Sequence, residues 1–188
     1  MLDFENAIDN LLKDVAKYET IDPNDIPNID LYMDQVTTFM EKNLKPYKRN
    51  DEDKVLTKTM INNYAKAKLF PPPVKKKYTK SHIILLIIIY HLKSILSLND
   101  INKVLTPVIA ETEKYPLFLE EVYAEFIKIQ QLITKNAIDK KATDLDLYEY
   151  IENSTQNEKV KYILSVIFLV LRANLSKSIA EKLIDMNF

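Results

Sequence analysis

The sequence predicts an all-α protein, and three observations support this fold class. None of the 188 residues is glycine, whereas average usage would supply about thirteen, so we expect no phosphate-cradling glycine loops, no type I′ hairpins and few left-handed helix caps. Apolar residues recur at helical spacing along most of the chain. Prolines fall mainly between these periodic segments, where they end helices.

The N-terminal part predicts two helices joined by a linker. Apolar residues recur at i, i+3, i+4 and i+7 spacing over residues 2–18, which is typical of an amphipathic helix. The proline-containing residues 21–28 should break this pattern. Asn28 is placed to cap a second helix, and a loop over residues 45–55 should follow that helix. The apolar face of the second helix is expected to consist of Tyr32, Val36, Phe39, Met40 and Leu44.

A third helix is expected over about residues 57–69, with Thr57 as its N-cap and Leu56 packed against Ile61. At about 100° per residue, one side of this helix is apolar and the opposite side carries amides, hydroxyls and lysines. Three consecutive prolines, residues 71–73, should end it because proline cannot donate a backbone hydrogen bond. The apolar side consists of Met60, Ile61 and Tyr64, and the polar side of Lys58, Thr59, Asn62, Asn63 and Lys66.

The rest of the chain predicts further helices. One apolar helix should begin at Thr79 or Ser81 and end near Leu96, and Ser97 with Asp100 forms a capping-box pattern for a helix over residues 98–105. Pro107 is expected to close this module. The remaining periodic segments are residues 117–138, 144–151 and 158–186, the last either continuous or broken near Ser176.

We therefore expect three regions: an N-terminal helix and linker over residues 1–27, a central module over 28–106, and a C-terminal helical region over 107–188. The central module concentrates basic charge, because residues 54–99 contain nine lysines and no Asp or Glu, whereas the other residues hold 17 basic and 27 acidic side chains. Such segregation is typical of a surface that meets phosphate. The alternative is a solvated lysine-rich face that keeps an acidic protein soluble.

Several residues of the module follow one another in a distinctive order: Tyr64, Leu69, Phe70, Pro71 to Pro73, Tyr78, Ser97, Leu98 and Ile101. This order resembles the DNA-binding module of the MerR family of bacterial regulators. The module also has a narrower resemblance, to a family of proteins from low-GC Gram-positive bacteria that carry domain of unknown function 1836. The resemblance rests on IDLYMDQVTTFM followed by LTKTMINNYAKAKLFPPPVKKKYTKSHI. The resemblance implies a MerR-like winged helix-turn-helix core, flanked by an N-terminal helix and a C-terminal helical bundle.

Three features depart from the MerR pattern. Lys68 stands where that family usually has glycine, so either Lys68 is left-handed at a cost of roughly 1 kcal/mol or the turn differs. Residues 74–77 are too few for a full β-hairpin, so the wing should be short or absent. The loop over residues 45–55 replaces the tight turn between the two helices.

The resemblance implies a dimeric transcriptional regulator that binds double-stranded DNA, with a recognition helix near residues 57–69 and a basic turn at 74–80. Thr59, Asn62, Asn63 and Lys66 would face the major groove, where amides pair with adenine edges. The residues expected at the DNA backbone are Lys58, Lys75, Lys76, Lys77, Tyr78 and Lys80. The helix over 117–138 would pair two copies, and the C-terminal region could hold an unidentified effector. The alternative is an adaptor that uses the same fold to bind an acidic protein.

Other classes of site find little support in the sequence. The absence of cysteine excludes disulfides, thiolate metal sites and thiol nucleophiles. His82 and His91 fall half a turn out of phase, so we interpret them as ordinary helix residues that share no metal. The acidic side chains between Asp144 and Glu152 lack the spacing of a calcium loop. We therefore expect no enzyme activity, no cofactor and no metal.

The sequence also predicts a cytoplasmic protein without a membrane segment. The acidic N-terminus lacks the basic and continuous apolar regions of a signal peptide. The longest apolar runs, residues 83–90 and 163–171, fall short of the roughly 20 residues that span a bilayer, and we interpret them as buried core helices.

Overall fold

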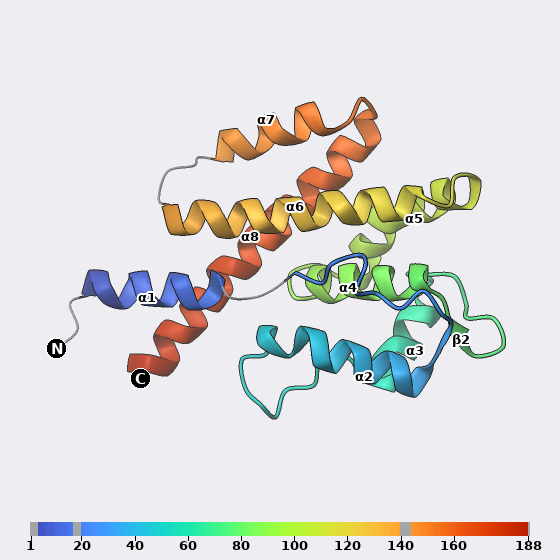
Figure 1. Ribbon diagram of the computed structural model, residues 1–188, viewed down its shortest axis with the longest axis horizontal. Helices are drawn as coiled ribbons and strands as arrows, with labels where there is room; N and C mark the ends of the chain where they lie inside the picture. The colour runs from blue at the N-terminus through green and yellow to red at the C-terminus, as the bar shows by residue number, and fades with distance from the viewer. Residues whose placement is uncertain (1–3, 17–19, 140–143, 188) are drawn as a thin grey trace. The chain divides into compact units, whose positions relative to one another are not determined.

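The structure is a computed structural model that describes residues 4–16, 20–139 and 144–187. These residues form two compact units, one of residues 21–124 and the other combining residues 1–20 with 125–188. Regular structure in both units is almost entirely helical (Figure 1). The predicted all-α class is confirmed at this level. Helix α6 (Phe118–Asp139) contributes residues to both units.

The unit of residues 21–124 is built around helix α4 (Lys80–Lys93). Every side chain of α4 from His82 to Ile89 is buried, as expected for a helix that is apolar on all sides. The other helices are α2 (Met33–Leu44), the 3-10 helix η1 (Lys45–Tyr47), α3 (Lys58–Lys66) and α5 (Leu98–Lys114). Their buried residues include Val36, Met40, Leu44, Ile61, Tyr64, Ile101, Leu105 and Val108.

Two predicted helix caps are present. The Thr57 Oγ1 atom accepts a hydrogen bond from the Met60 backbone N–H at 3.1 Å, at the start of α3. The Ser97 Oγ atom accepts from the Asp100 backbone N–H at 3.1 Å and donates to Asp100 Oδ2 at 2.7 Å. These contacts satisfy backbone donors that the first turn of a helix leaves free.

The start of α2 differs from the prediction. Strand β1 (Leu31–Tyr32) pairs antiparallel with β2 (Lys77–Tyr78), with Leu31 opposite Tyr78 and Tyr32 opposite Lys77. This pairing keeps the backbone extended up to Tyr32, which is the N-cap residue of α2. Asn28 as the N-cap is therefore wrong. The Tyr32 side chain is 55% exposed and is not part of the buried face of α2.

Pro107 does not end a helix. Helix α5 is continuous from Leu98 to Lys114 and contains Pro107 in its interior. Its buried side chains Leu105 and Val108 lie on either side of the proline. An interior proline costs about 3 kcal/mol, and burial of this continuous apolar face offsets that cost.

The other unit contains α1 (Phe4–Ala16), α7 (Asp144–Ser154), α8 (Glu158–Asn187) and most of α6. Helices α1 and α7 each contact α8, which is drawn in red in Figure 1. The predicted first helix agrees with α1, although residues 2, 3, 17 and 18 lie outside the described residues. Helix α8 continues through Ser176 without a break.

Helix α8 is the one helix in the described ranges that is long and apolar enough to cross a membrane, judged by length and composition alone. Of its most apolar 18-residue window, 33% is buried inside the protein. The buried side chains lie between Val160 and Leu171, so the first half of α8 serves as a core helix.

Candidate nucleic-acid interface

Helix α3 exposes the polar side that the sequence predicted. Ile61 and Tyr64 are buried and anchor the apolar side of the helix in the core. Met60 is half-buried. The polar side of α3 lies opposite this buried side, so it faces solvent. All five of its predicted residues are exposed: Lys58, Thr59, Asn62, Asn63 and Lys66.

The end of α3 is a left-handed turn built without glycine. Lys68 has a φ of 57°. The Leu69 N–H donates to the Tyr64 carbonyl oxygen at 3.0 Å, and the Lys68 N–H donates to the Ala65 carbonyl oxygen at 3.0 Å. This pair of bonds defines a Schellman motif, whose apolar contact Tyr64 and Leu69 can supply because both are buried. Of the two options for Lys68, the left-handed one is confirmed.

The basic segment after the prolines forms a two-residue turn. Lys75 and Lys76 have φ values of 50° and 63°, and the Lys77 N–H donates to the Val74 carbonyl oxygen at 2.9 Å. Positive φ at both central residues is the signature of a type I′ turn. A minimal hairpin therefore exists, and the expectation that a glycine-free chain lacks type I′ turns is wrong. In Figure 1 this turn projects beside β2.

His82 connects the proline segment to the start of α4. Its Nδ1 atom lies 3.1 Å from the Thr79 backbone nitrogen, which can only donate, so Nδ1 is the acceptor. Its Nε2 atom therefore carries the proton and donates to the Pro71 carbonyl oxygen at 3.0 Å. Burial lowers the pKa of His82 and favours this neutral form. We interpreted His82 as an ordinary helix residue, and its bracing role depends on contacts that the sequence does not reveal.

The exposed lysines differ in their partners. Within the described parts of the chain, Lys66, Lys75 and Lys76 make no ion pair. Lys58 pairs with Asp34, and Lys77 Nζ lies 5.8 Å from the centre of the Tyr32 ring. Lys66 and the two turn lysines therefore carry the least compensated positive charge of the predicted set.

Two predicted contact residues are placed differently from the rest. Tyr78 is only 3% exposed, so its assignment to a DNA-contacting surface is wrong. Successive residues of a strand point to opposite faces, and here Lys77 is the outward neighbour while Tyr78 enters the core. Lys80 is half-buried, and its Nζ atom pairs with Glu120 Oε2 at 2.8 Å. The surface turn therefore ends at Lys77.

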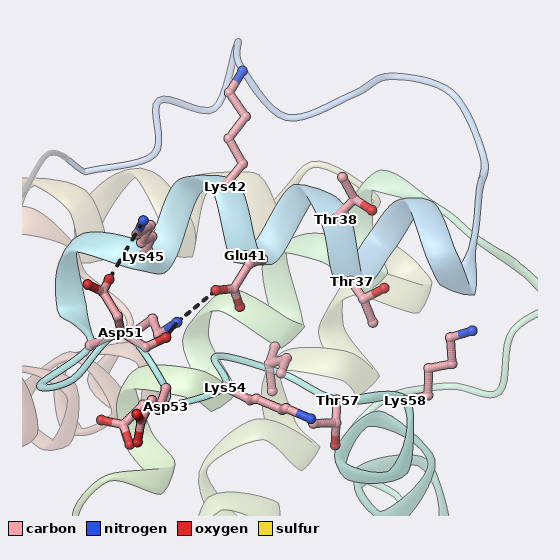
Figure 2. A pocket seen from close by; sticks show the side chains of 13 residues that line it. Thr37, Thr38, Glu41, Lys42, Lys45, Asp51, Asp53, Lys54, Thr57 and Lys58 are labelled. Atoms are coloured by element: carbon pink, nitrogen blue, oxygen red, sulfur yellow. Dashed lines mark hydrogen bonds and ion pairs between the residues drawn. The ribbon is translucent and has the colours of Figure 1, made fainter.

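A charged groove of about 790 Å³ lies between the exposed side of α2 and the loop that leads to α3 (Figure 2). The loop is tied to α2 through Glu41, which pairs with Lys48 Nζ at 2.9 Å and accepts from the Val55 N–H at 3.4 Å. The Lys48 hydrogen bond lowers the pKa of Glu41. These contacts hold the loop against α2.

The groove mixes both signs of charge. Its lining includes five lysines and four carboxylates. Lys45 and Asp51, for example, face one another at 3.7 Å. Sequence reasoning missed Lys42, Lys45 and Lys54 as groove residues, because their convergence depends on how the loop folds back over α2. Across the described residues, no group of three or more His, Asp or Glu side chains could hold a metal ion.

The comparison with protein families identifies the unit that carries these features. The family described as Domain of unknown function (DUF1836) matches residues 21–126, which is more than half of the chain. The chain belongs to the DUF1836 family. The resemblance to the family with domain of unknown function 1836 is therefore confirmed. The DUF1836 domain includes α2 to α5 and the basic turn, whereas α1, α7 and α8 lie outside it. No curated protein and no solved structure matches the chain.

Proposed function

We propose that the DUF1836 domain is the DNA-binding module of a transcriptional regulator, with α3 as the recognition helix. The observation that carries the proposal is the exposed face of α3, on which Asn62, Asn63 and Lys66 stand free of the core. Asparagine amides can pair with adenine edges in the major groove, and lysine can contact guanine or phosphate. The MerR-like order of residues supports the same assignment.

The type I′ turn supplies the contact with the DNA backbone. Lys75 and Lys76 are exposed at its centre, and both lack an ion pair within the described residues. Positive side chains of this kind neutralise phosphates and position a protein without reading sequence. Val74, which is 73% exposed, would lie against the sugar edge beside them.

The regulator would act as a homodimer on two half-sites, as the MerR resemblance implies. The resemblance predicts that residues 117–138 pair two copies. Helix α6 buries Leu119, Phe126, Ile129 and Ile133 within a single chain, so little of its apolar side is free to pair with a second copy. The homodimer therefore needs another surface.

Fluorescence anisotropy with a nonspecific duplex at several salt concentrations tests the proposal. Affinity should fall with salt at a log-log slope of about −0.9 per neutralised phosphate. Replacing Lys66, Lys75 and Lys76 with glutamine should make this slope shallower by about 2 to 3. Lys93→Gln is the matched control, because Lys93 is an exposed lysine on α4 outside the proposed surface. Absence of binding at low salt, or an equal effect of the control, would refute the proposal.

Sequence reading is tested separately on a selected operator. Asn62→Ala should cost about 1–3 kcal/mol of discrimination at one base pair and leave nonspecific affinity almost unchanged. If Asn62→Ala leaves the base-pair preference unchanged, α3 is not the recognition helix.

The mixed charge of the groove supports a second candidate, an adaptor that docks a protein partner. A surface that holds both lysines and carboxylates complements a folded protein better than a uniform polyanion. This candidate predicts no duplex binding at low salt. Variants of the groove residues Lys42 and Lys54 should then weaken capture of the partner, whereas Lys93→Gln should not.

A further inference from the structure

A second, smaller cavity of about 220 Å³ lies inside the DUF1836 domain. Its lining comes from Pro71, the start of α4 with its N-cap residue Thr79, the C-terminal part of α5 and the first turn of α6. Neither the family match nor the proposed DNA surface assigns a role to this cavity. Its walls are apolar and its other lining groups are polar, and this combination indicates which class of ligand it can bind.

The walls of the cavity are apolar. Leu85, Ile109 and Leu119 contribute side chains to them, and Leu85 and Leu119 are buried. An engineered cavity of about 150 Å³ with a similar lining remains free of water and binds benzene. A cavity of about 220 Å³ is therefore large enough for one ring with a short substituent.

The polar groups at the cavity are mainly acceptors. Thr112 Oγ1 donates its proton to the Val108 carbonyl oxygen at 2.7 Å, so its lone pairs can accept a hydrogen bond. Within the described residues, Ser81 and Glu113 have no hydrogen-bond or ion-pair partner. Glu113 brings a carboxylate to the lining.

The two remaining polar residues of the lining, Thr79 and His82, bond one another and do not alter this balance. Both ring nitrogens of His82 are used, by Thr79 and by Pro71. The nearby Lys80 pairs with Glu120 at 2.8 Å, so its charge is compensated. A ligand that fits the cavity should therefore bring a hydrogen-bond donor with positive charge toward Glu113.

We propose that this cavity binds a small molecule that has a single apolar ring and an ammonium group. The ring would fill the space between Leu85, Ile109 and Leu119, and the ammonium would reach the acceptors of Ser81, Thr112 and Glu113. Binding of such an amine is independent of whether the domain binds DNA.

Titration of the full chain with benzylamine, followed by backbone amide NMR, tests this site. Benzylamine should cause saturable shifts of amides at the start of α4 and the end of α5. Toluene fills the same volume without the ammonium and should bind more weakly. Benzoate should cause no saturable shift, because its carboxylate would approach the Glu113 carboxylate.

Glu113→Gln should weaken benzylamine binding about two- to fivefold, as expected for loss of a partly solvated charge pair. It should leave toluene binding unchanged. Glu111→Gln is the matched control, because Glu111 is on the same helix but pairs with Lys114 at 3.1 Å and does not line the cavity. The proposal is overturned by the absence of saturable benzylamine binding, by equal affinity of the Glu113→Gln variant, or by benzoate binding as tightly as benzylamine.

Discussion

The side-chain amide of Asn102 binds the backbone of the left-handed residue Lys68, with Nδ2 at 3.1 Å from the Lys68 carbonyl oxygen. The same nitrogen also donates to the Ala67 carbonyl oxygen at 3.1 Å. Asn102 belongs to α5, whereas Ala67 and Lys68 follow α3. Helix α5 thereby holds the turn that joins the exposed face of α3 to the basic segment.

Asn102→Ala should lower the free energy of unfolding by about 1–2 kcal/mol, because two carbonyl groups lose their donor. Urea denaturation measures the change. Asn99→Ala provides the control, since Asn99 is an exposed residue of the same helix and gains the same helix propensity. If both variants have the same free energy of unfolding, the hydrogen bonds to Ala67 and Lys68 make no net contribution to stability.

Lys68→Gly should raise the free energy of unfolding by about 0.5–1 kcal/mol, because glycine adopts a positive φ without steric cost. Lys66→Gly, two residues earlier within α3, should instead lower it by about 1 kcal/mol. Thermal or urea denaturation compares the two. A loss of stability in Lys68→Gly would contradict the left-handed assignment of this residue.

The double change Lys75→Asn and Lys76→Gly should affect stability and DNA affinity in opposite directions. Asn-Gly is the preferred pair for a type I′ turn, so stability should rise by about 1 kcal/mol. The loss of two lysines should make the salt slope of duplex binding shallower by about 2. Urea denaturation and anisotropy measure the two effects. A less stable variant would argue against the type I′ geometry.

The stability of the protein should fall between pH 6.5 and pH 4 because of His91. Burial lowers the pKa of this side chain to about 4, whereas it titrates near 6.5 in the unfolded chain. Between these values the unfolded chain binds a proton that the folded chain does not, so stability is lost as pH falls. Linkage gives a loss of roughly 3 kcal/mol at the lower limit.

His91→Phe isolates this contribution. The His91 ring packs edge-on against Tyr47, with centroids 4.8 Å apart, and phenylalanine can keep that packing. Urea midpoints at pH 4.5, 5.5 and 7 should show a shallower pH dependence in the variant. Some dependence should persist, because the pKa of His82 is also lowered by burial. An unchanged slope would mean that His91 does not titrate as its burial implies.

Local patterns predicted much of the fold and part of the site. The apolar period located the helices, and Thr57 and Ser97 marked two N-caps that the structure contains. The polar side of α3 also followed from its period, since Asn62 and Lys66 are exposed opposite the buried Ile61. These features depend on residues within a few positions of one another, so a single sequence is enough to predict them.

Contacts between distant segments decided the rest. Because β1 pairs with β2, α2 begins after Tyr32 and not after Asn28. The same pairing directs the Tyr78 side chain into the core. Lys77, which pairs with Tyr32, also closes the turn in which Lys75 and Lys76 have positive φ. Burial of Leu105 and Val108 on either side of Pro107 keeps α5 continuous through a residue that usually ends a helix.

The sequence by itself determined where helices form and which side of α3 is polar, because side-chain period and capping act locally. Only the tertiary structure decided that Lys68, Lys75 and Lys76 take left-handed conformations, and that Asn102 holds the backbone at Lys68. A conformational cost of roughly 1 kcal/mol per left-handed residue is acceptable only where packing and hydrogen bonds from elsewhere in the chain exceed it. A sequence without glycine therefore still forms these turns.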